Sequence, residues 1–451
     1  MTNEPAHNES GAPLQQWRTL RALSHGNYRR FFIGQGVSLL GTWMQLTALP
    51  WLVYRLTKDP FLVGLNNFAS NIPWLLLLPV AGVFLDRWNL LRMVMVTQAL
   101  AMVQAFILAG LVLFGAADIW QLIVLSLSLG CVNAFDLPAR QAMLPELLET
   151  REDLSNAIAL NSSLFNAARL VGPALAGLLS SFGSVGEGWC FLLNAVSFLA
   201  VLISLTTITV KPPLVRPEVS PFFEGLAEGL RYVWGHPPIR AVLVLVAIVG
   251  FVAMPYTVLI PIFAGDVLQG DPQTYGWLLA ASGFGALIGA LYLASRPNIR
   301  GSASRIVVTG LIAAASMTAF AFSQNIALSM VLMLLSGMNV MLMLVSCNTL
   351  VQTIVPDDMR GRAMSLYSMA FMGLTPFGHL IGGWIASRWD PTTAMLICAT
   401  GCLAGSVWFV PYLGVVRAAI REHVRPKTIA VVIAAEGENV VAELPEEVSR
   451  V

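Results

Sequence analysis

Charged residues are scarce in this chain. Asp, Glu, Lys and Arg make up 11% of its 451 residues, whereas hydrophobic residues make up 56%. A soluble domain carries roughly 25% charged residues, because a surface that faces water must be hydrated. The composition therefore excludes a water-soluble protein. The formal net charge of +1 gives no reason to expect a nucleic-acid partner.

Enzyme motifs and ligand sets for metals are also lacking. The sequence contains no G-x-x-x-x-G-K-[ST] loop, no H-E-x-x-H, no paired carboxylates at one depth and no long catalytic loop, which argues against a membrane-embedded enzyme. Five cysteines lie in apolar segments without a pairing pattern, and Cys398-x-x-x-Cys402 is interpreted as helix packing. Residues 1–30 lack the apolar core of a cleavable signal. We expect no catalytic residue, no metal and no cofactor.

Long apolar runs dominate instead. A spanning helix needs about 20 apolar residues, and the sequence predicts an all-α membrane protein with twelve transmembrane helices near 31–54, 61–85, 91–115, 119–137, 154–180, 189–210, 239–264, 274–295, 304–322, 326–353, 363–387 and 392–416.

These runs predict five regions: a cytoplasmic segment (1–30), a six-helix bundle (31–210), a linker (211–238), a second six-helix bundle (239–417) and a cytoplasmic tail (418–451). The linker reads PFFEGLAEGLRYVWGHPP, whose apolar stripe opposes its charged residues and predicts an amphipathic helix at the membrane surface.

Basic residues orient the chain. With both termini and the even-numbered loops in the cytoplasm, 22 of the 26 Lys and Arg residues lie on that side. Arg55, Lys58 and Arg388 fall outside, and Arg169 lies within a span. We therefore expect a multi-pass protein of the cytoplasmic membrane with both termini cytoplasmic.

Two stretches of the sequence share the same pattern of Gln, Pro and Gly residues. Gln141-x-x-x-Pro145 corresponds to Gln352-x-x-x-Pro356, and Gly172…Gly177 corresponds to Gly378…Gly383. Two membrane-embedded copies of one plan are typical of transporters, which bind substrate where the repeats meet. The sequence therefore predicts two pseudo-symmetric six-helix bundles and a function in transport.

Several motifs resemble the major facilitator superfamily, and within it the branch of transmembrane secretion effectors that includes siderophore and macrolide exporters. Gly82-x-x-x-Asp86-Arg87 is similar to the superfamily's loop signature between spans 2 and 3. The branch is indicated by SLLGTWMQLTALPWLVYRLT, NAFDLPARQAMLPEL, NAARLVGPALAG, EGLRYVWGHPPIR and VPDDMRGRAMSLYS. The resemblance implies the major facilitator fold and a loop acid that latches the two halves together. We expect the conformational latch at Asp86, Arg87, Arg140, Arg360 and Arg362.

Polar side chains inside the spans are candidates for a substrate cavity. Facing lipid they would be unsatisfied, at a cost of several kcal/mol, so they should face inward. A water-filled cavity and helix–helix hydrogen bonds both meet that need. Because the resemblance implies a cavity lined by spans 1, 4, 7 and 10, we expect these residues to line one: Gln35, Ser38, Thr42, Gln45, Asn67, Asn71, Asn133, Tyr256 and Asn339.

Arg169 and His379 are ionisable residues deep within the spans and are candidates for substrate binding or ion coupling. Asn133, Asn166 and Asn194 are possible partners of Arg169, but an amide cannot neutralise it. An anionic or electron-rich substrate would then fit, whereas a structural role for Arg169 and plain packing for His379 are the alternatives. Helix packing is predicted for Gly172, Pro173, Gly177, Gly285 and Gly289, with Gly285-x-x-x-Gly289 against the fifth span.

The hypothesis with the widest support is a secondary active transporter that exports a small amphipathic molecule (a drug, siderophore or metabolite) by alternating access. Its partners would be the small-molecule substrate, the lipid bilayer and protons as the coupling ion, and we expect a monomer. An uptake permease of the same fold and a transporter-like receptor without turnover are the alternatives.

Overall fold

The computed structural model describes residues 20–209, 222–295 and 301–422, and every regular element in these ranges is helical. Residues 1–19, 210–221, 296–300 and 423–451 lie outside the described residues, and with them most of the predicted terminal regions and the first part of the linker. The side chains of Asp86 and Arg87 also lie outside the description, although their backbone belongs to a helix.

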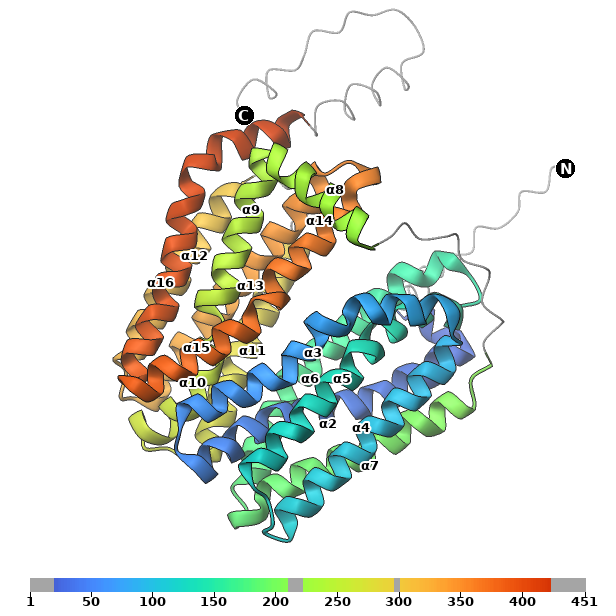
Figure 1. The fold of residues 1–451 in the computed structure, drawn as a ribbon, viewed down its shortest axis with the longest axis vertical. Coiled ribbons are helices and arrows are strands. Elements are labelled where there is room, and N and C mark those ends of the chain that lie inside the picture. Colours follow the sequence, from blue (N-terminus) through green and yellow to red (C-terminus); the bar gives the residue numbers. More distant parts are fainter. Residues whose placement is uncertain (1–19, 210–221, 296–300, 423–451) are drawn as a thin grey trace, which may run out of the picture.

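The N-terminal half consists of six long helices (Figure 1). They are α2 (Gly26–Thr57), α3 (Pro60–Arg87), α4 (Leu90–Leu113), α5 (Ile119–Met143), α6 (Leu154–Ser180) and α7 (Gly186–Thr206). A short turn, η1 (Arg21–Ser24), precedes them, and η2 (Leu144–Leu147) and η3 (Arg151–Asp153) join α5 to α6. α5 runs beyond the predicted end at residue 137, so Arg140 lies on a helix rather than in a loop.

The C-terminal half contains two composite helices. The first is α9 (Pro237–Ile248), η5 (Val249–Ala253), α10 (Tyr256–Ile262) and η6 (Phe263–Val267); the second is α14 (Asp357–Ser368), η7 (Met369–Gly373) and α15 (Thr375–Arg388). η5, η6 and η7 are π-helical turns. Pro255 and Pro376 follow two of these turns, and a proline breaks the regular backbone ladder because it has no N–H. Each composite helix corresponds to one predicted span, 239–264 or 363–387.

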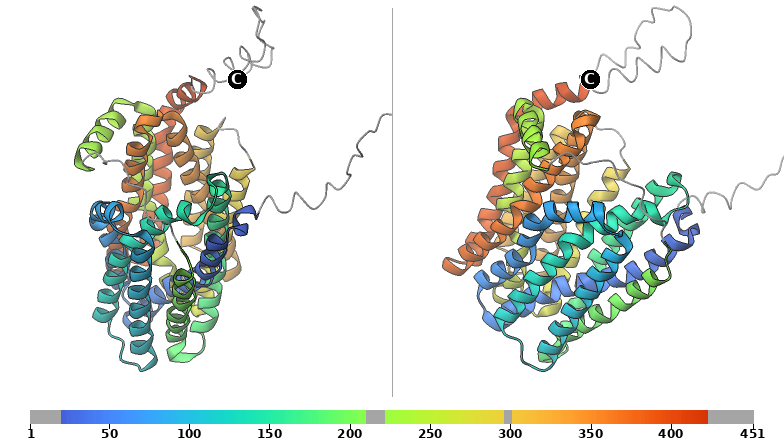
Figure 2. Two further views of the ribbon diagram at one scale, coloured as in Figure 1. Left: turned by 90° about the vertical axis from the view of Figure 1, so that its right-hand side faces the viewer. Right: turned by 45° about the vertical axis from the view of Figure 1, so that its right-hand side comes forward.

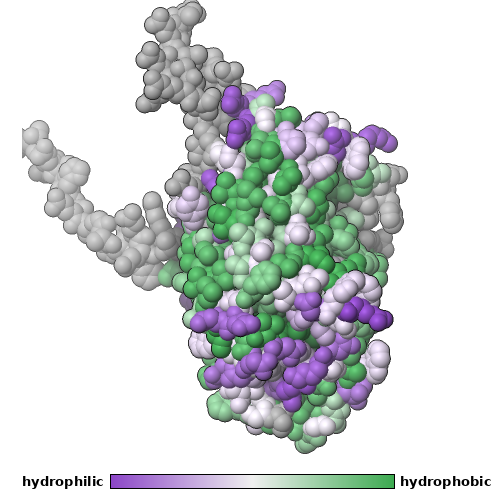
Figure 3. All heavy atoms as spheres, turned by 90° about the vertical axis from the view of Figure 1, so that its left-hand side faces the viewer, coloured by the Kyte–Doolittle hydropathy of each residue, from purple (hydrophilic) through white to green (hydrophobic). Residues whose placement is uncertain are grey.

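Four regular helices complete this half: α11 (Pro272–Ala294), α12 (Ser302–Ala321), α13 (Ile326–Ile354) and α16 (Pro391–Phe409), the last continued by the short turn η8 (Val410–Tyr412). Among the described residues, nine segments are long and apolar enough to cross a membrane. α2, α3 and α6 have similar lengths and pack with them. This arrangement confirms an all-α membrane protein and is consistent with twelve spans. On the face in Figure 3, apolar surface lies between hydrophilic residues above and below.

The two halves converge at one end and diverge at the other (Figures 1 and 2). We call the converging end, which carries the turns at Asp59-Pro60 and Asp271-Pro272, the Asp-Pro end. The opposite end carries Arg140 and Arg362, and we call it the arginine end. The linker helix α8 (Phe222–Gly235) lies at the arginine end against α14 and α9.

The orientation in the membrane is a prediction with a direct test. Reporter fusions after Arg240, Arg305 and Arg425 should report the cytoplasm, and fusions near Lys58, Glu187 and Asp271 should report the exterior, because most Lys and Arg residues then remain inside. Alkaline phosphatase and fluorescent-protein activities measure the two sides. A cytoplasmic signal at Asp271 would contradict the division into six plus six spans.

Candidate functional site

Two helix crossings join the halves near the Asp-Pro end. α3 crosses α15 at Gly64 and Gly383: a β-carbon placed on Gly64 would lie 2.6 Å from the His379 carbonyl oxygen. α6 crosses α11 at Gly177 and Gly276, where a β-carbon on Gly276 would lie 2.6 Å from the Pro173 carbonyl oxygen. Real β-carbons do not approach this closely, so both crossings require glycine.

The glycines at these crossings belong to a repeat that the sequence reasoning missed. Asp59-Pro60-x-x-x-Gly64 opens α3, and Asp271-Pro272-x-x-x-Gly276 opens α11. In each copy the aspartate caps the helix by accepting a backbone N–H bond, from Phe61 in one and Thr274 in the other. The recurring D-P-x-x-x-G motif could have revealed this repeat from the sequence. It places a capped helix start and a close-packing glycine at equivalent points of both halves.

Polar and aromatic contacts also join the two halves at the Asp-Pro end. The Tyr54 hydroxyl of α2 donates a hydrogen bond to the Asp266 carboxylate on η6. Gln273 Nε2 donates to Ser181 Oγ over 3.3 Å. The rings of Trp51 and Tyr275 stack with their centroids 5.7 Å apart. The halves are therefore joined here by hydrogen bonds and ring packing as well as by glycine contacts.

At the arginine end, the described charged residues pair within their own half. Arg140 binds Asp136 at 2.7 Å, and that carboxylate also accepts hydrogen bonds from Thr97 and Gln98 of α4. In the other half, Arg362 binds Glu228 of α8 at 3.0 Å. Arg360 pairs with Asp357, one turn before it on the same helix. The structure therefore does not bring Arg140 to Arg360 or Arg362, and the side chains of Asp86 and Arg87, the other predicted latch residues, lie outside the description.

A pocket of about 230 Å³ lies between the halves, beside the two crossings. Both halves supply its walls, because α2, α3 and α6 face α10 and α11 across it. Its described lining combines aromatic, polar and apolar side chains with one cation. The lining residues are Trp43, Leu46, Thr47, Pro50, Asn67, Arg169, Pro173, Tyr256, Thr257, Tyr275, Leu279, Ser282 and Gly283.

Arg169 is the cation of this pocket. It is half-buried, and no hydrogen bond or ion pair joins it to another residue in the part of the chain that the structure describes. The predicted amide partners are engaged elsewhere: Asn194 donates to Gln45, and Asn166 donates to the Ser162 carbonyl of its own helix. No Asp or Glu is among the described residues that line the pocket. The pocket therefore presents a positive charge that its own lining does not neutralise.

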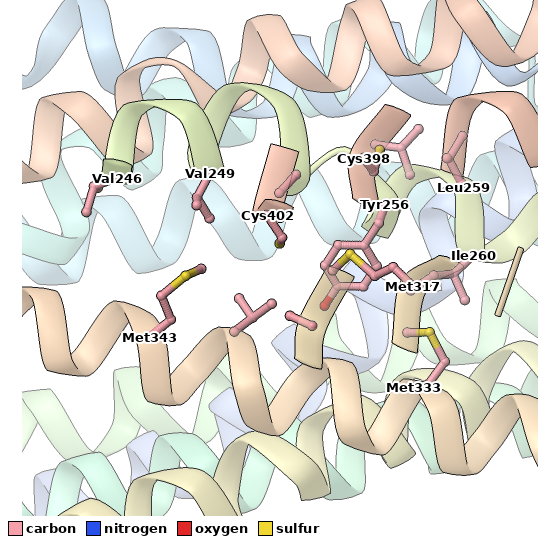
Figure 4. Packing of buried hydrophobic residues seen from close by; sticks show 14 of the residues in the cluster. Val246, Val249, Tyr256, Leu259, Ile260, Met317, Met333, Met343, Cys398 and Cys402 are labelled. Carbon is pink, nitrogen blue, oxygen red and sulfur yellow. The ribbon is translucent and has the colours of Figure 1, made fainter. Parts of the chain in front are cut away.

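Tyr256 and His379 belong to the C-terminal half and lie on that half's side of the pocket. Tyr256 is buried, with its hydroxyl 3.4 Å from Ser282 Oγ. Figure 4 shows it in the hydrophobic core of this half, in the same cluster as Met317 and Cys402. His379 is buried just behind the lining, with Nε2 3.4 Å from Thr257 Oγ1, and its Nδ1 has no hydrogen-bond partner among the described residues. Thr257 thus connects His379 to the pocket.

Comparison with known proteins settles the family. A family model described as transmembrane secretion effector matches residues 18–443. The chain belongs to the transmembrane secretion effector family. Its members are membrane transporters of the major facilitator type, so this chain is a transporter and not an enzyme.

Curated relatives of this transmembrane secretion effector are named as exporters or transporters. The multidrug efflux pump Tap of Mycolicibacterium fortuitum is 25% identical over 77% of this chain and 86% of its own length. The staphyloferrin A transporter of Staphylococcus aureus is 25% identical over 78% and 87%. The enterobactin exporter EntS of Shigella boydii is 23% identical over 84% and 90%.

Solved structures confirm the major facilitator fold. The nucleoside transporter NupG superposes with a TM-score of 0.65 at 14% identity, covering 86% of this chain and 98% of that one. A bacterial homologue of the iron transporter ferroportin, solved inward-facing, gives 0.68 at 19% identity, covering 86% and 98%. At these identities the likeness concerns the fold alone.

Only some of the residues that were predicted to line a substrate cavity lie at the pocket of this secretion effector. Asn67 and Tyr256 line it, as does the coupling candidate Arg169. Gln45 is buried among helices, where its amide bonds Gln104 of α4 and Asn194 of α7. This is the helix–helix alternative that the sequence left open. Of the other candidates, Gln35, Ser38 and Asn339 are buried away from the pocket, Thr42 is half-buried, and Asn71 and Asn133 are exposed outside it.

The predicted packing glycines have partners that the sequence did not assign. Gly177 packs against α11, whereas Gly172 packs against Trp43 of α2. Gly285 and Gly289 were expected against the fifth span, and this was wrong. A β-carbon on Gly285 would lie 2.0 Å from the Leu334 carbonyl oxygen of α13, and one on Gly289 would lie 2.9 Å from that of Met338. The fifth span instead meets α11 at Gly276 and Gly283, on another face of the helix.

An ionic cluster anchors the start of the first span at the arginine end. His25 Nε2 lies 2.8 Å from Asp153, and Arg21 Nε lies 2.8 Å from the other oxygen of the same carboxylate. The hydrogen bond from His25, with those from Thr150 and the charge of Arg21, holds the pKa of the Asp153 carboxyl below its usual value. A lowered pKa means that this contribution to stability is present at neutral pH and is lost as the pH falls through that pKa.

Proposed function

We propose that this protein is a secondary active transporter that exports a small amphipathic anion from the cytoplasm by alternating access. The observation that carries the proposal is the pocket between the halves, whose described lining combines Arg169 with three aromatic side chains and contains no acid. A carboxylate or catecholate would supply the missing negative charge, and the rings of Trp43, Tyr256 and Tyr275 suit an apolar or aromatic body.

Alternating access is supported by where the halves touch. In the orientation predicted from the basic residues, the Asp-Pro end is external, and the crossings close the pocket toward that side. At the arginine end the described ion pairs stay within each half, which fits an inward-facing state. Opening to the exterior would require the two glycine crossings and the Tyr54–Asp266 bond to separate, while the arginine end closes.

The proposal also includes ion coupling. His379 is a buried histidine behind the lining, and its Nε2 lies 3.4 Å from Oγ1 of Thr257, which lines the pocket. We propose protons as the coupling ion and His379 as the group that carries them. The protein is proposed to act as a monomer, since each chain carries both halves of the pocket.

The decisive experiment is transport into inverted membrane vesicles. Labelled carboxylate and catecholate compounds are compared with neutral and cationic compounds of the same size, with and without a pH gradient. Saturable, gradient-dependent accumulation of the anions is the expected result. Accumulation only in right-side-out vesicles would identify an uptake permease. Saturable binding without accumulation would identify a receptor without turnover.

The contact between Tyr54 and Asp266 gives a prediction about the external closure. Tyr54→Phe removes the hydroxyl that donates to the carboxylate and leaves the ring in place. A hydrogen bond to a charged group contributes about 1.5–3 kcal/mol. The equilibrium between the inward-facing and outward-open states should therefore shift roughly ten- to hundredfold toward the outward-open state. Labelling of a Thr47→Cys pocket cysteine by an impermeant thiol reagent, in a Cys131→Ser background, measures this shift.

The matched control is Tyr412→Phe, because the Tyr412 ring packs at a tilt against Trp408 within the C-terminal half, away from the contacts that join the halves. It should leave external labelling unchanged. If Tyr54→Phe labels no faster than this control, the Tyr54–Asp266 bond does not hold the closure.

A further inference from the structure

A second hollow lies at the arginine end, away from the pocket between the halves. It is a groove of about 320 Å³ bounded by α8, α9 and the α14–η7 segment. Ten of its eleven lining residues are apolar, and the remaining one is Arg240. The lining residues are Leu230, Val233, Trp234, Arg240, Leu243, Val244, Ala247, Leu366, Met369, Ala370 and Leu374.

In the orientation predicted from the basic residues, the groove runs from the membrane surface into the bilayer. Along α9 it extends from Arg240 to Ala247, and along the facing segment from Leu366 to Leu374. At 1.5 Å per residue these stretches span roughly 10–12 Å. That depth accommodates the upper part of one acyl chain. The shape therefore suits a molecule with an apolar chain below and a head group near Arg240.

The positive charge of Arg240 at the mouth of the groove favours an anionic head group. Arg240 donates one hydrogen bond over 3.2 Å to the Trp234 carbonyl oxygen, so most of its five N–H donors remain for a ligand. Arg231 on α8 and His236 just after it are also exposed at this end of the molecule. Among the described side chains, Glu228 is paired with Arg362, and Asp358 on α14 lies near Tyr232 of α8.

Exposed apolar side chains on α8 mark the depth of the site. Trp234 is 64% exposed and Leu230 is 47% exposed, one helical turn apart on the same face. Tryptophan at such a position is typical of the lipid head-group region, where its ring is apolar and its N–H is hydrated. The mouth of the groove thus lies at the level of lipid phosphates.

We propose that this groove is a binding site for one anionic phospholipid of the adjacent leaflet, with an acyl chain between α9 and η7 and the phosphate on Arg240. The lipid would hold α8 against α14, where Gly229 already packs on Arg362 and Leu366. Phosphatidylglycerol serves as the probe. Phosphatidylcholine carries the same phosphate, but its quaternary ammonium offsets that charge and weakens the attraction to Arg240 and its basic neighbours.

Native mass spectrometry of the purified full-length protein with phosphatidylglycerol or phosphatidylcholine tests the site. The wild type should retain phosphatidylglycerol about fivefold better, the order of preference that one arginine contributes at an anionic membrane surface. Arg240→Gln should reduce this preference to near parity. Arg417→Gln is the matched control, since Arg417 also lies at the arginine end but binds Ser304 outside the groove, and it should behave like the wild type.

A second variant tests the acyl-chain part without changing charge. Ala370→Phe fills the groove from η7, and retention of both lipids should fall; Ala247→Phe fills it from α9 if the first variant is not monodisperse. Equal retention of the two lipids by the wild type, or an Arg240→Gln protein that matches Arg417→Gln, would overturn the proposal. A dimer peak that disappears in Ala370→Phe would do so too, by assigning the groove to a second copy of the chain.

Discussion

Arg169→Gln is expected to reduce transport of anionic substrates by one to two orders of magnitude while the protein still reaches the membrane. Arg169 is the cation among the described residues that line the pocket, and no acid accompanies it there. Its loss removes a charge-assisted contact of about 1.5–3 kcal/mol with the substrate. Initial rates in inverted vesicles, normalised to protein abundance, measure the effect.

Arg169→Lys should restore part of the rate. Lysine keeps the charge but loses the planar fork that binds a carboxylate through two parallel hydrogen bonds. The control is Asn166→Ala on the same helix, because the Asn166 side chain bonds only its own helix in the described structure. Normal transport by both Arg169 variants would show that the charge is dispensable. Absence of the Gln variant from the membrane would show that its role is structural.

Gly276→Leu is expected to reduce transport strongly by preventing the two halves from closing at the Asp-Pro end. A β-carbon at this position would lie 2.6 Å from the Pro173 carbonyl oxygen and 2.9 Å from the α-carbon of Gly177, so α6 and α11 would have to move apart. Overpacking of this kind costs about 1–3 kcal/mol, and here the cost arises only in the closed arrangement. Transport should therefore fall about five- to 150-fold.

The same variant should expose the pocket to the outside. A Thr47→Cys side chain in the Cys131→Ser background should react with an impermeant thiol reagent faster when Gly276→Leu is present. Gly110→Leu is the matched control, since a β-carbon on Gly110 would have no atom within 4 Å outside its own helix. Full transport by the Gly276→Leu protein would mean that the crossing need not close during the cycle.

The candidate site was accessible to sequence reasoning only where a residue is unusual for its surroundings. Arg169 is a cation within an apolar span, and Tyr256 lies between two prolines, so both could be selected, and both line the pocket. Trp43, Thr47 and Tyr275 line it as well, but their types are ordinary in a membrane helix. Gln35, Ser38 and Gln45 face inward as predicted, but the Gln45 amide forms hydrogen bonds with α4 and α7 instead of lining the pocket.

By itself the sequence determined the class of the protein, the positions of its helices and the twofold plan. Those features are local, since apolar length, capping residues such as Asp59 and Asp271, and repeated glycines each act within one segment. Tertiary structure alone decided which face of each helix meets which neighbour. In a bilayer both lipid and helix interfaces are apolar, so hydropathy does not distinguish them. For that reason the contact of Gly285 with α13, the bond between Tyr54 and Asp266, and the pocket around Arg169 emerge only when the helices are packed together.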